Sequence, residues 1–173
     1  MIATRFAVLF ALLLAACSGC SSSAPSSPSS TSTFTPPAAS TAWKVTQRFA
    51  SVVGPDNCWV REQRERWTGA VFTDLPMTID RSGGSITLQS SFFAVNYAGT
   101  ISGPDFSASG TQPLEGGGRP CRDGTSFQQL PGASNLTGSF SSDDRTMTAT
   151  EINSYRLTTG EAVTYTWAWQ ATR

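Results

Sequence analysis

The C-terminal segment alternates between large apolar and polar side chains, and this pattern constrains the fold more than any other. One face of the segment carries Val163, Tyr165, Trp167, Trp169 and Ala171. The intervening positions carry mainly threonine and glutamine. Because successive side chains of a β-strand point to opposite faces, this spacing predicts a strand with one buried face. It disfavours an amphipathic helix, whose apolar positions recur about every 3.6 residues.

The same period of two recurs along the chain and is interrupted by turn residues. Apolar positions alternate into and out of residues 81–84, which end in two glycines and predict a tight hairpin. Similar turn clusters lie at residues 103–105, 141–145 and 158–161. The pattern predicts an all-β fold, an antiparallel up-and-down meander of about eight strands. Because closure removes exposed edges, we expect a small β-barrel, with a β-sandwich as the alternative.

One short segment departs from the meander. Residues 58–67 carry Glu62 and Arg66 at helical spacing and follow Asp56, a candidate N-cap. This favours a single short helix near residues 58–67. The strand before it is expected to bury one face, which is formed by Trp43, Val45, Phe49 and Val53.

The first residues have the layout of an export signal. Arg5 precedes an apolar run, residues 6–14, and small residues follow at positions 15 and 16. The run is too short to span a bilayer but has the length of a signal-peptide core. We therefore expect residues 1–16 to be a signal peptide.

The sequence Leu14-Ala15-Ala16-Cys17 resembles the lipobox of bacterial lipoproteins. In that family the cysteine receives a diacylglycerol, the chain is cut before it, and the new amino group is acylated. The resemblance implies that Cys17 anchors the protein in the membrane, since stable anchoring takes at least two acyl chains. Cys20 is a second candidate acceptor, but it lacks the preceding large aliphatic residue. Because Ser18 follows Cys17, the resemblance implies outer-membrane sorting in a Gram-negative host; a plain secreted protein is the alternative.

A tether and one domain are expected after the leader. Residues 17–41 consist almost wholly of serine, threonine, alanine and proline, a composition that cannot bury enough surface to fold. We expect this segment to be a disordered spacer. Residues 42–173 have the usual length of one domain and form the expected barrel.

The two remaining cysteines, Cys58 and Cys121, are expected to form a disulfide. Export would place them in an oxidising compartment, and neither has the CxxC spacing of a metal or redox site. Cys121 lies in the Gly- and Pro-rich residues 112–134, which predict a long loop. The bridge would fasten this loop to the segment that follows the first strand.

Composition excludes several functional classes. The 12 basic and 12 acidic residues balance, and without a basic patch nucleic acid is not an expected partner. The chain contains no histidine, which removes Ser-His-Asp and Cys-His catalysis and the commonest metal ligand. Glycines at 116–118 do not lie between a strand and a helix, as a phosphate loop requires. No cofactor or metal is expected.

Carboxylates are the remaining candidates for chemistry. By alternation, Glu151 and Asn153 lie on a buried face, where a carboxylate needs a partner such as Arg48 or Arg156, or a place at the barrel mouth. Asp143 and Asp144 are explained by a solvent-exposed turn. A carboxylate-dependent hydrolase that uses Glu151 or Asp74 is therefore an alternative function.

Aromatic residues supply a candidate ligand cup. In rhythm, the segments that begin at Trp67-Thr68-Gly69 and Tyr97-Ala98-Gly99-Thr100 are similar to lipocalin-type and avidin-type barrels, with no family ligand motif to carry over. We expect non-catalytic binding of a small apolar ligand or an envelope partner, and a purely structural envelope role is a further alternative. The candidate cup consists of Trp43, Tyr97, Glu151, Tyr165, Trp167 and Trp169. Packing of the same aromatic residues in a closed core is the other interpretation.

Overall fold

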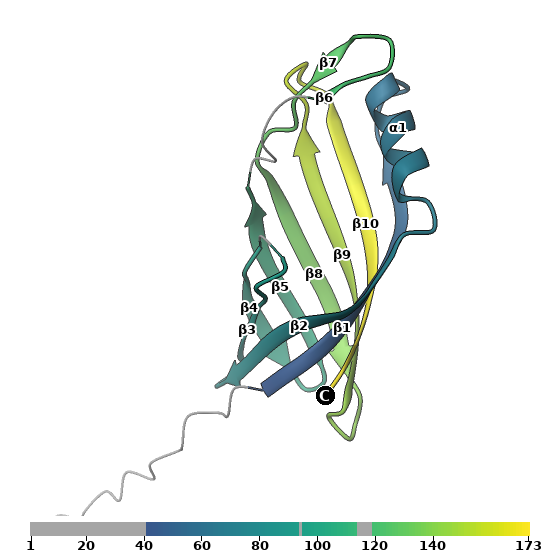
Figure 1. Ribbon diagram of the computed structural model, residues 1–173. Helices are drawn as coiled ribbons and strands as arrows, with labels where there is room; N and C mark the ends of the chain where they lie inside the picture. Colours follow the sequence, from purple (N-terminus) through teal and green to yellow (C-terminus); the bar gives the residue numbers. More distant parts are fainter. Residues whose placement is uncertain (1–40, 94, 114–118) are drawn as a thin grey trace, which may run out of the picture. The chain divides into compact units, whose positions relative to one another are not determined.

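The computed structural model describes residues 41–93, 95–113 and 119–173. In this part of the chain eight strands close into one barrel, in the spatial order β1-β10-β9-β8-β5-β4-β3-β2 (Figure 1). All neighbouring strands are antiparallel. The strands are β1 (Thr41–Val53), β2 (Val71–Ser82), β3 (Ser85–Gln89), β4 (Tyr97–Ser102), β5 (Asp105–Gln112), β8 (Gly132–Phe140), β9 (Thr146–Arg156) and β10 (Ala162–Thr172).

The expected all-β meander and closed barrel are confirmed, and the alternative β-sandwich is not formed. The expected signal peptide, the lipidation site Cys17, and all but the last residue of the tether lie outside the described residues. The barrel lies within a compact unit, Pro36–Arg173, which contains its own core and disulfide. This unit therefore holds what it needs to fold by itself.

The hairpin turns lie where the sequence places them. Gly83 and Gly84 both have positive φ angles, 56° and 84°, between β2 and β3. Two consecutive positive φ angles match the right-handed twist of a two-residue hairpin, and glycine adopts them without steric penalty.

The inward faces of β9 and β10 follow strict alternation. Every second residue is buried from Met147 to Tyr155 and from Val163 to Ala171. In β1 the alternation breaks, because the pairing register with β10 shifts between Phe49 and Ser51. This bulge moves Val52 inward and leaves Val53 65% exposed, so the expected inward position of Val53 is wrong.

The helix α1 (Cys58–Trp67) forms where it is expected and lies beside the barrel end at which β10 begins (Figure 1). Its N-cap is Asn57, whose side chain accepts a hydrogen bond from the backbone N–H of Val60 at 3.0 Å; the candidate Asp56 is one residue too early. Glu62 is not ion-paired with Arg66 and instead accepts the backbone N–H of Arg122. The described residues contain no helix long and apolar enough to cross a membrane.

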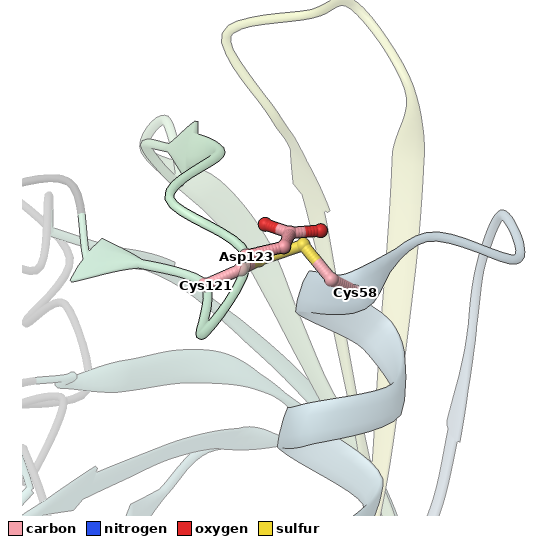
Figure 2. Close-up of side chains that lie close together, drawn as sticks. All are labelled: Cys58, Cys121 and Asp123. Atoms are coloured by element: carbon pink, nitrogen blue, oxygen red, sulfur yellow. A yellow bond between two sulfur atoms is a disulfide. The ribbon is translucent and has the colours of Figure 1, made fainter.

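A disulfide joins α1 to the loop between β5 and β8, as expected. Cys58 bonds to Cys121, which lies between the short strands β6 (Arg119–Pro120) and β7 (Ser126–Phe127) (Figure 2). The segment expected to be one long loop thus contains a small two-stranded sheet. The bridge spans 63 residues, for which the chain-entropy model gives about 4 kcal/mol of stabilisation.

The opposite end of the barrel is closed by aromatic packing and an ion pair. Trp43 meets Phe140 edge to face, with ring centroids 5.6 Å apart. The Arg81 guanidinium lies over the Phe140 ring and also pairs with Asp144. Asp144 pairs with Arg173 as well, so its role extends beyond that of a solvent-exposed turn residue. These contacts fill the barrel end that lies away from α1, and the candidate site lies at the end beside α1.

Candidate functional site: a cavity at the helix end of the barrel

A buried carboxyl group lies at the centre of the site. Glu151 points inward from the middle of β9 and is 2% exposed. Its two neighbours on the same face of the strand, Ala149 and Asn153, are also buried. The expectation that alternation directs Glu151 and Asn153 into the barrel is confirmed.

Neutral donors surround the two carboxyl oxygens. Oε1 accepts from the Tyr97 hydroxyl at 2.5 Å, and the Ser134 hydroxyl lies 2.9 Å from it. Oε2 accepts from Gln47 Nε2 at 2.7 Å and from Trp169 Nε1 at 2.9 Å. The two oxygens of a carboxyl group offer about four acceptor positions, and Tyr97, Gln47 and Trp169 occupy three of them. The single proton of the Ser134 hydroxyl can go either to Oε1 or to the Oδ1 atom of Asn153, which lies 2.5 Å away.

Of the two alternatives expected for Glu151, an arginine partner or a place at the barrel mouth, the arginine partner is not found in the described part of the chain. Arg48 and Arg156 are exposed and lie at strand positions of the opposite phase, which direct their side chains away from the interior. Arg156 instead donates to the carbonyl oxygen of Gly160. Among the ion pairs of the described residues, none includes Glu151. Hydrogen bonds alone therefore compensate for burying this carboxyl group.

Tyr97 remains a neutral hydrogen-bond donor in this network. Burial, and after it the charge of Glu151, raise the pKa of the Tyr97 hydroxyl far above its ordinary value of 10.0. The Tyr97 phenol therefore stays protonated and donates a hydrogen bond to the carboxyl group of Glu151.

A cavity of about 380 Å³ lies next to Glu151, and we call it the helix-end cavity. Its size falls within the range of small-molecule pockets. Residues of α1, of five barrel strands and of the loops beside them line it. They are Gln47, Gln63, Trp67, Phe72, Phe92, Phe93, Gln112, Gln129, Glu151, Asn153, Tyr155, Tyr165 and Trp167.

The structure brings together part of the predicted cup. Glu151, Tyr165 and Trp167 line the helix-end cavity. Tyr97 and Trp169 lie behind the lining and donate to Glu151.

Trp43 does not belong to the cup. It packs on Phe140 at the other end of the barrel and borders a separate hollow, together with residues of β2 and the segment after β3. A strand of 13 residues crosses the whole barrel, so a correctly assigned inward face does not indicate which end a residue reaches.

Sequence reasoning missed most of the amide groups in the lining. Gln47 lies between Val45 and Phe49 on the alternate positions of β1 that face inward, so the sequence pattern does indicate that its side chain is buried. Gln63 follows the buried Trp59 by four positions on α1, a spacing that places both on one face of a helix. Gln129 and Phe92 lie in irregular segments, where no periodicity marks them.

The acidic residues proposed for hydrolysis do not converge. Glu151 is the only acidic residue in the lining of the helix-end cavity, within the part of the chain that the structure describes. Asp74 is exposed on β2 and has a φ of 56°. Glycoside hydrolysis needs two carboxyl groups on opposite sides of one bond, an arrangement these residues do not form.

One cluster of potential metal ligands occurs among the described residues, and its chemistry does not suit a metal. Cys58, Cys121 and Asp123 have their ligand atoms within 4.8 Å of one another (Figure 2). Both sulfur atoms are consumed in the disulfide. The backbone N–H of Thr125 donates to the Asp123 carboxylate, and this bond lowers the pKa of Asp123. The cluster is therefore a turn that is held by a disulfide bond.

Comparisons with known proteins give no relative. No family model, curated protein or solved structure matches the chain. The site must therefore be interpreted from its own geometry.

Proposed function

We propose that the protein is a bacterial lipoprotein, anchored through Cys17, whose barrel binds a small ligand in the helix-end cavity without catalysing a reaction. The helix-end cavity carries this proposal. It is large enough for a small molecule, it opens at one end of a closed barrel, and seven aromatic side chains line it. A purely structural envelope protein would have no need of such an interior.

The anchoring part of the proposal rests on the lipobox resemblance at residues 14–17. A triacylated Cys17 would hold the protein in a membrane, the outer membrane in a Gram-negative host. Anchoring through Cys17 requires that the protein is exported. The disulfide between Cys58 and Cys121 supports export, since such bonds persist in oxidising compartments.

Ligand binding is tested with N-phenyl-1-naphthylamine, an uncharged probe whose fluorescence rises in apolar surroundings. The measurement uses segment 36–173 with the Cys58–Cys121 disulfide formed. We expect saturable binding that Gln112→Trp weakens at least tenfold, because the indole would fill the helix-end cavity that Gln112 lines. Gln170→Trp is the matched control, since Gln170 is exposed on the outer face of β10.

Two results would contradict ligand binding in the helix-end cavity: no saturable signal, or an equal loss in both tryptophan variants. In that case an envelope protein as the partner becomes the stronger hypothesis.

The anchor is tested separately by labelling cells with a fatty-acid probe. The wild type and Cys20→Ala are expected to carry the label, and Cys17→Ala is expected to lose it. Equal labelling of Cys17→Ala and the wild type would remove the anchor from the proposal, and ligand binding would be unaffected by that result.

A further inference from the structure

Five carboxamide side chains line the helix-end cavity; Gln112 is partly exposed, and the other four are almost fully buried and come from four separate parts of the fold. Gln47 comes from β1, Gln63 from α1, Gln129 from the segment between β7 and β8, and Asn153 from β9. They are 7%, 8%, 8% and 4% exposed, respectively. Each is thus more than nine-tenths buried, yet each borders the same cavity.

Neighbouring groups determine which amide atoms remain for a ligand. Gln47 donates from Nε2 to Oε2 of Glu151, so the oxygen of the Gln47 amide is left over. Gln63 turns its oxygen to the indole N–H of Trp67, at 2.9 Å, so its NH₂ group is left over.

Asn153 and Gln129 add further hydrogen-bonding capacity. The Asn153 Oδ1 atom lies 2.5 Å from the Ser134 hydroxyl, which leaves its NH₂ group. The Gln129 backbone bridges to Leu157, while its side chain has no hydrogen-bond partner within the described residues. The helix-end cavity therefore presents both donors and acceptors. A buried donor or acceptor without a partner is unfavourable, so a purely apolar ligand would leave a penalty at each amide.

The charges around the helix-end cavity exclude charged ligands. Among the residues that the structure describes, neither lysine nor arginine belongs to its lining, so an anion would find no counter-charge there. Glu151 is the only acidic group among these lining residues, and the donors of Tyr97, Gln47 and Trp169 already occupy its oxygens. A cation would have to displace these donors. Transfer of an unpaired charge from water into such a site is strongly unfavourable.

Aromatic rings provide the remaining contact surface. Trp167 meets Trp67 edge to face at 5.7 Å and lies 6.0 Å from Phe72. Phe92 is 56% exposed beside Phe72, at the rim. Such a wall favours a ligand with a flat or ring-shaped apolar part.

We propose that the helix-end cavity selects an uncharged ring compound that carries hydrogen-bond donors and acceptors, such as an amide or hydroxyl group. This proposal rests on the proposed function and narrows the ligand class, which the sequence alone indicated as apolar.

The test uses four probes that share one ring and differ in the attached group. They are naphthalene, 2-naphthamide, 2-naphthoate and the 2-naphthylmethylammonium ion, titrated calorimetrically into segment 36–173. We expect 2-naphthamide to bind at least tenfold more tightly than each of the other three. Tighter or equal binding of naphthalene, of the anion or of the cation would overturn the selectivity, while binding in the cavity would stand.

Gln129→Leu tests the role of the amides, and Gln128→Leu is the matched control. Gln128 is the chain neighbour of Gln129 and does not line the helix-end cavity. We expect Gln129→Leu to lower the affinity for 2-naphthamide about tenfold and to leave naphthalene binding unchanged or stronger. An equal loss for both probes would contradict the inference, as would the same loss in Gln128→Leu.

The two proposals fail in different ways. If none of the four probes and no N-phenyl-1-naphthylamine binds, the proposed function itself is wrong, and the ligand class falls with it. If probes bind but their order does not follow the amide group, only the ligand class is wrong. The comparison of wild-type affinities needs no variant, so a substitution that impairs folding does not prevent the test.

Discussion

The hydrogen bond from the Trp169 indole to Glu151 is expected to stabilise the barrel through a coupling that a double-mutant cycle can measure. Trp169 Nε1 lies 2.9 Å from Oε2, and both residues are at most 2% exposed. The cycle combines Glu151→Leu with Trp169→Phe. The phenylalanine retains an aromatic ring for packing and removes only the indole N–H and part of the ring volume.

The magnitude follows from what each variant leaves unpaired. Glu151→Leu removes the acceptor for Trp169, Gln47 and Tyr97, and buried donors without a partner cost about 1–3 kcal/mol each. A loss of about 4 kcal/mol is therefore expected, reduced by the removal of a buried carboxyl group. In the Glu151→Leu background the N–H of Trp169 is already unpaired. Trp169→Phe should then be less destabilising by about 1–3 kcal/mol than in the wild type.

Glu151→Gln is the conservative comparison, and we expect it to be tolerated far better. Trp169 and Gln47 can only donate through the atoms that face Oε2, whereas the hydroxyls of Tyr97 and Ser134 can also accept. A glutamine can therefore place its oxygen towards Trp169 and Gln47 and its NH₂ towards the hydroxyls. The expected loss is about 1–2 kcal/mol, from the change of charge-assisted to neutral hydrogen bonds.

Urea unfolding of segment 36–173, followed by circular dichroism, measures all four corners of the cycle. A coupling below about 0.5 kcal/mol would refute the reasoning, because residues that share no interaction are additive within that margin. Equal destabilisation by Glu151→Gln and Glu151→Leu would refute it as well. If Glu151→Leu is too unstable to measure, a second cycle combines Glu151→Gln with Tyr97→Phe. In that cycle Tyr97→Phe removes the hydroxyl that donates to Glu151.

Three further predictions concern stability. Reduction of the Cys58–Cys121 bridge is expected to lower the free energy of unfolding by about 4 kcal/mol, and urea midpoints with and without reductant check this. The folded state raises the pKa of Tyr97, so above about pH 10 this hydroxyl ionises only in the unfolded chain, and the free energy of unfolding is expected to fall as the pH rises. Urea titrations at alkaline pH check this, and Tyr97→Phe should make the free energy of unfolding depend less on pH. The hydrogen bond from Arg81 lowers the pKa of Asp144, so Asp144→Asn is expected to destabilise the protein by less than about 1 kcal/mol at pH 7. This difference should vanish as the pH falls below about 4, and thermal unfolding measured across acidic pH checks it.

Local patterns determined how much of the fold was predictable from the sequence. Strict alternation in β9 and β10 placed Glu151 and Trp167 on the inner face, because neither strand contains a bulge. The same rule failed for Val53, since the bulge after Phe49 shifts the phase and leaves no mark in the residue types. The error for Asp56 has a similar origin, because adjacent Asp and Asn are both good N-caps.

The partners of Glu151 were not predictable for a different reason. Gln47, Tyr97 and Ser134 come from β1, β4 and β8, so their meeting depends on the register between distant strands and on barrel closure. Alternation gives the face of each strand, but it does not give the height at which a residue lies in the barrel. The same limit explains why alternation alone predicts Trp43 in the cup, although it lies at the opposite end of the barrel.

The geometry of Glu151 indicates a positioning residue and weighs against a hydrolase. A general acid or base must offer an oxygen to the substrate at hydrogen-bond distance. Here Tyr97 already donates to Oε1, while Gln47 and Trp169 donate to Oε2. Because the carboxyl group fixes the nitrogen of Gln47, it also decides that the Gln47 oxygen remains for a ligand. A hydrophobic residue would fill the same space with a smaller desolvation cost, but it would leave the orientation of that amide unspecified. In the ligand site that we propose, Glu151 would contribute to selection by fixing the orientation of the neutral Gln47 amide.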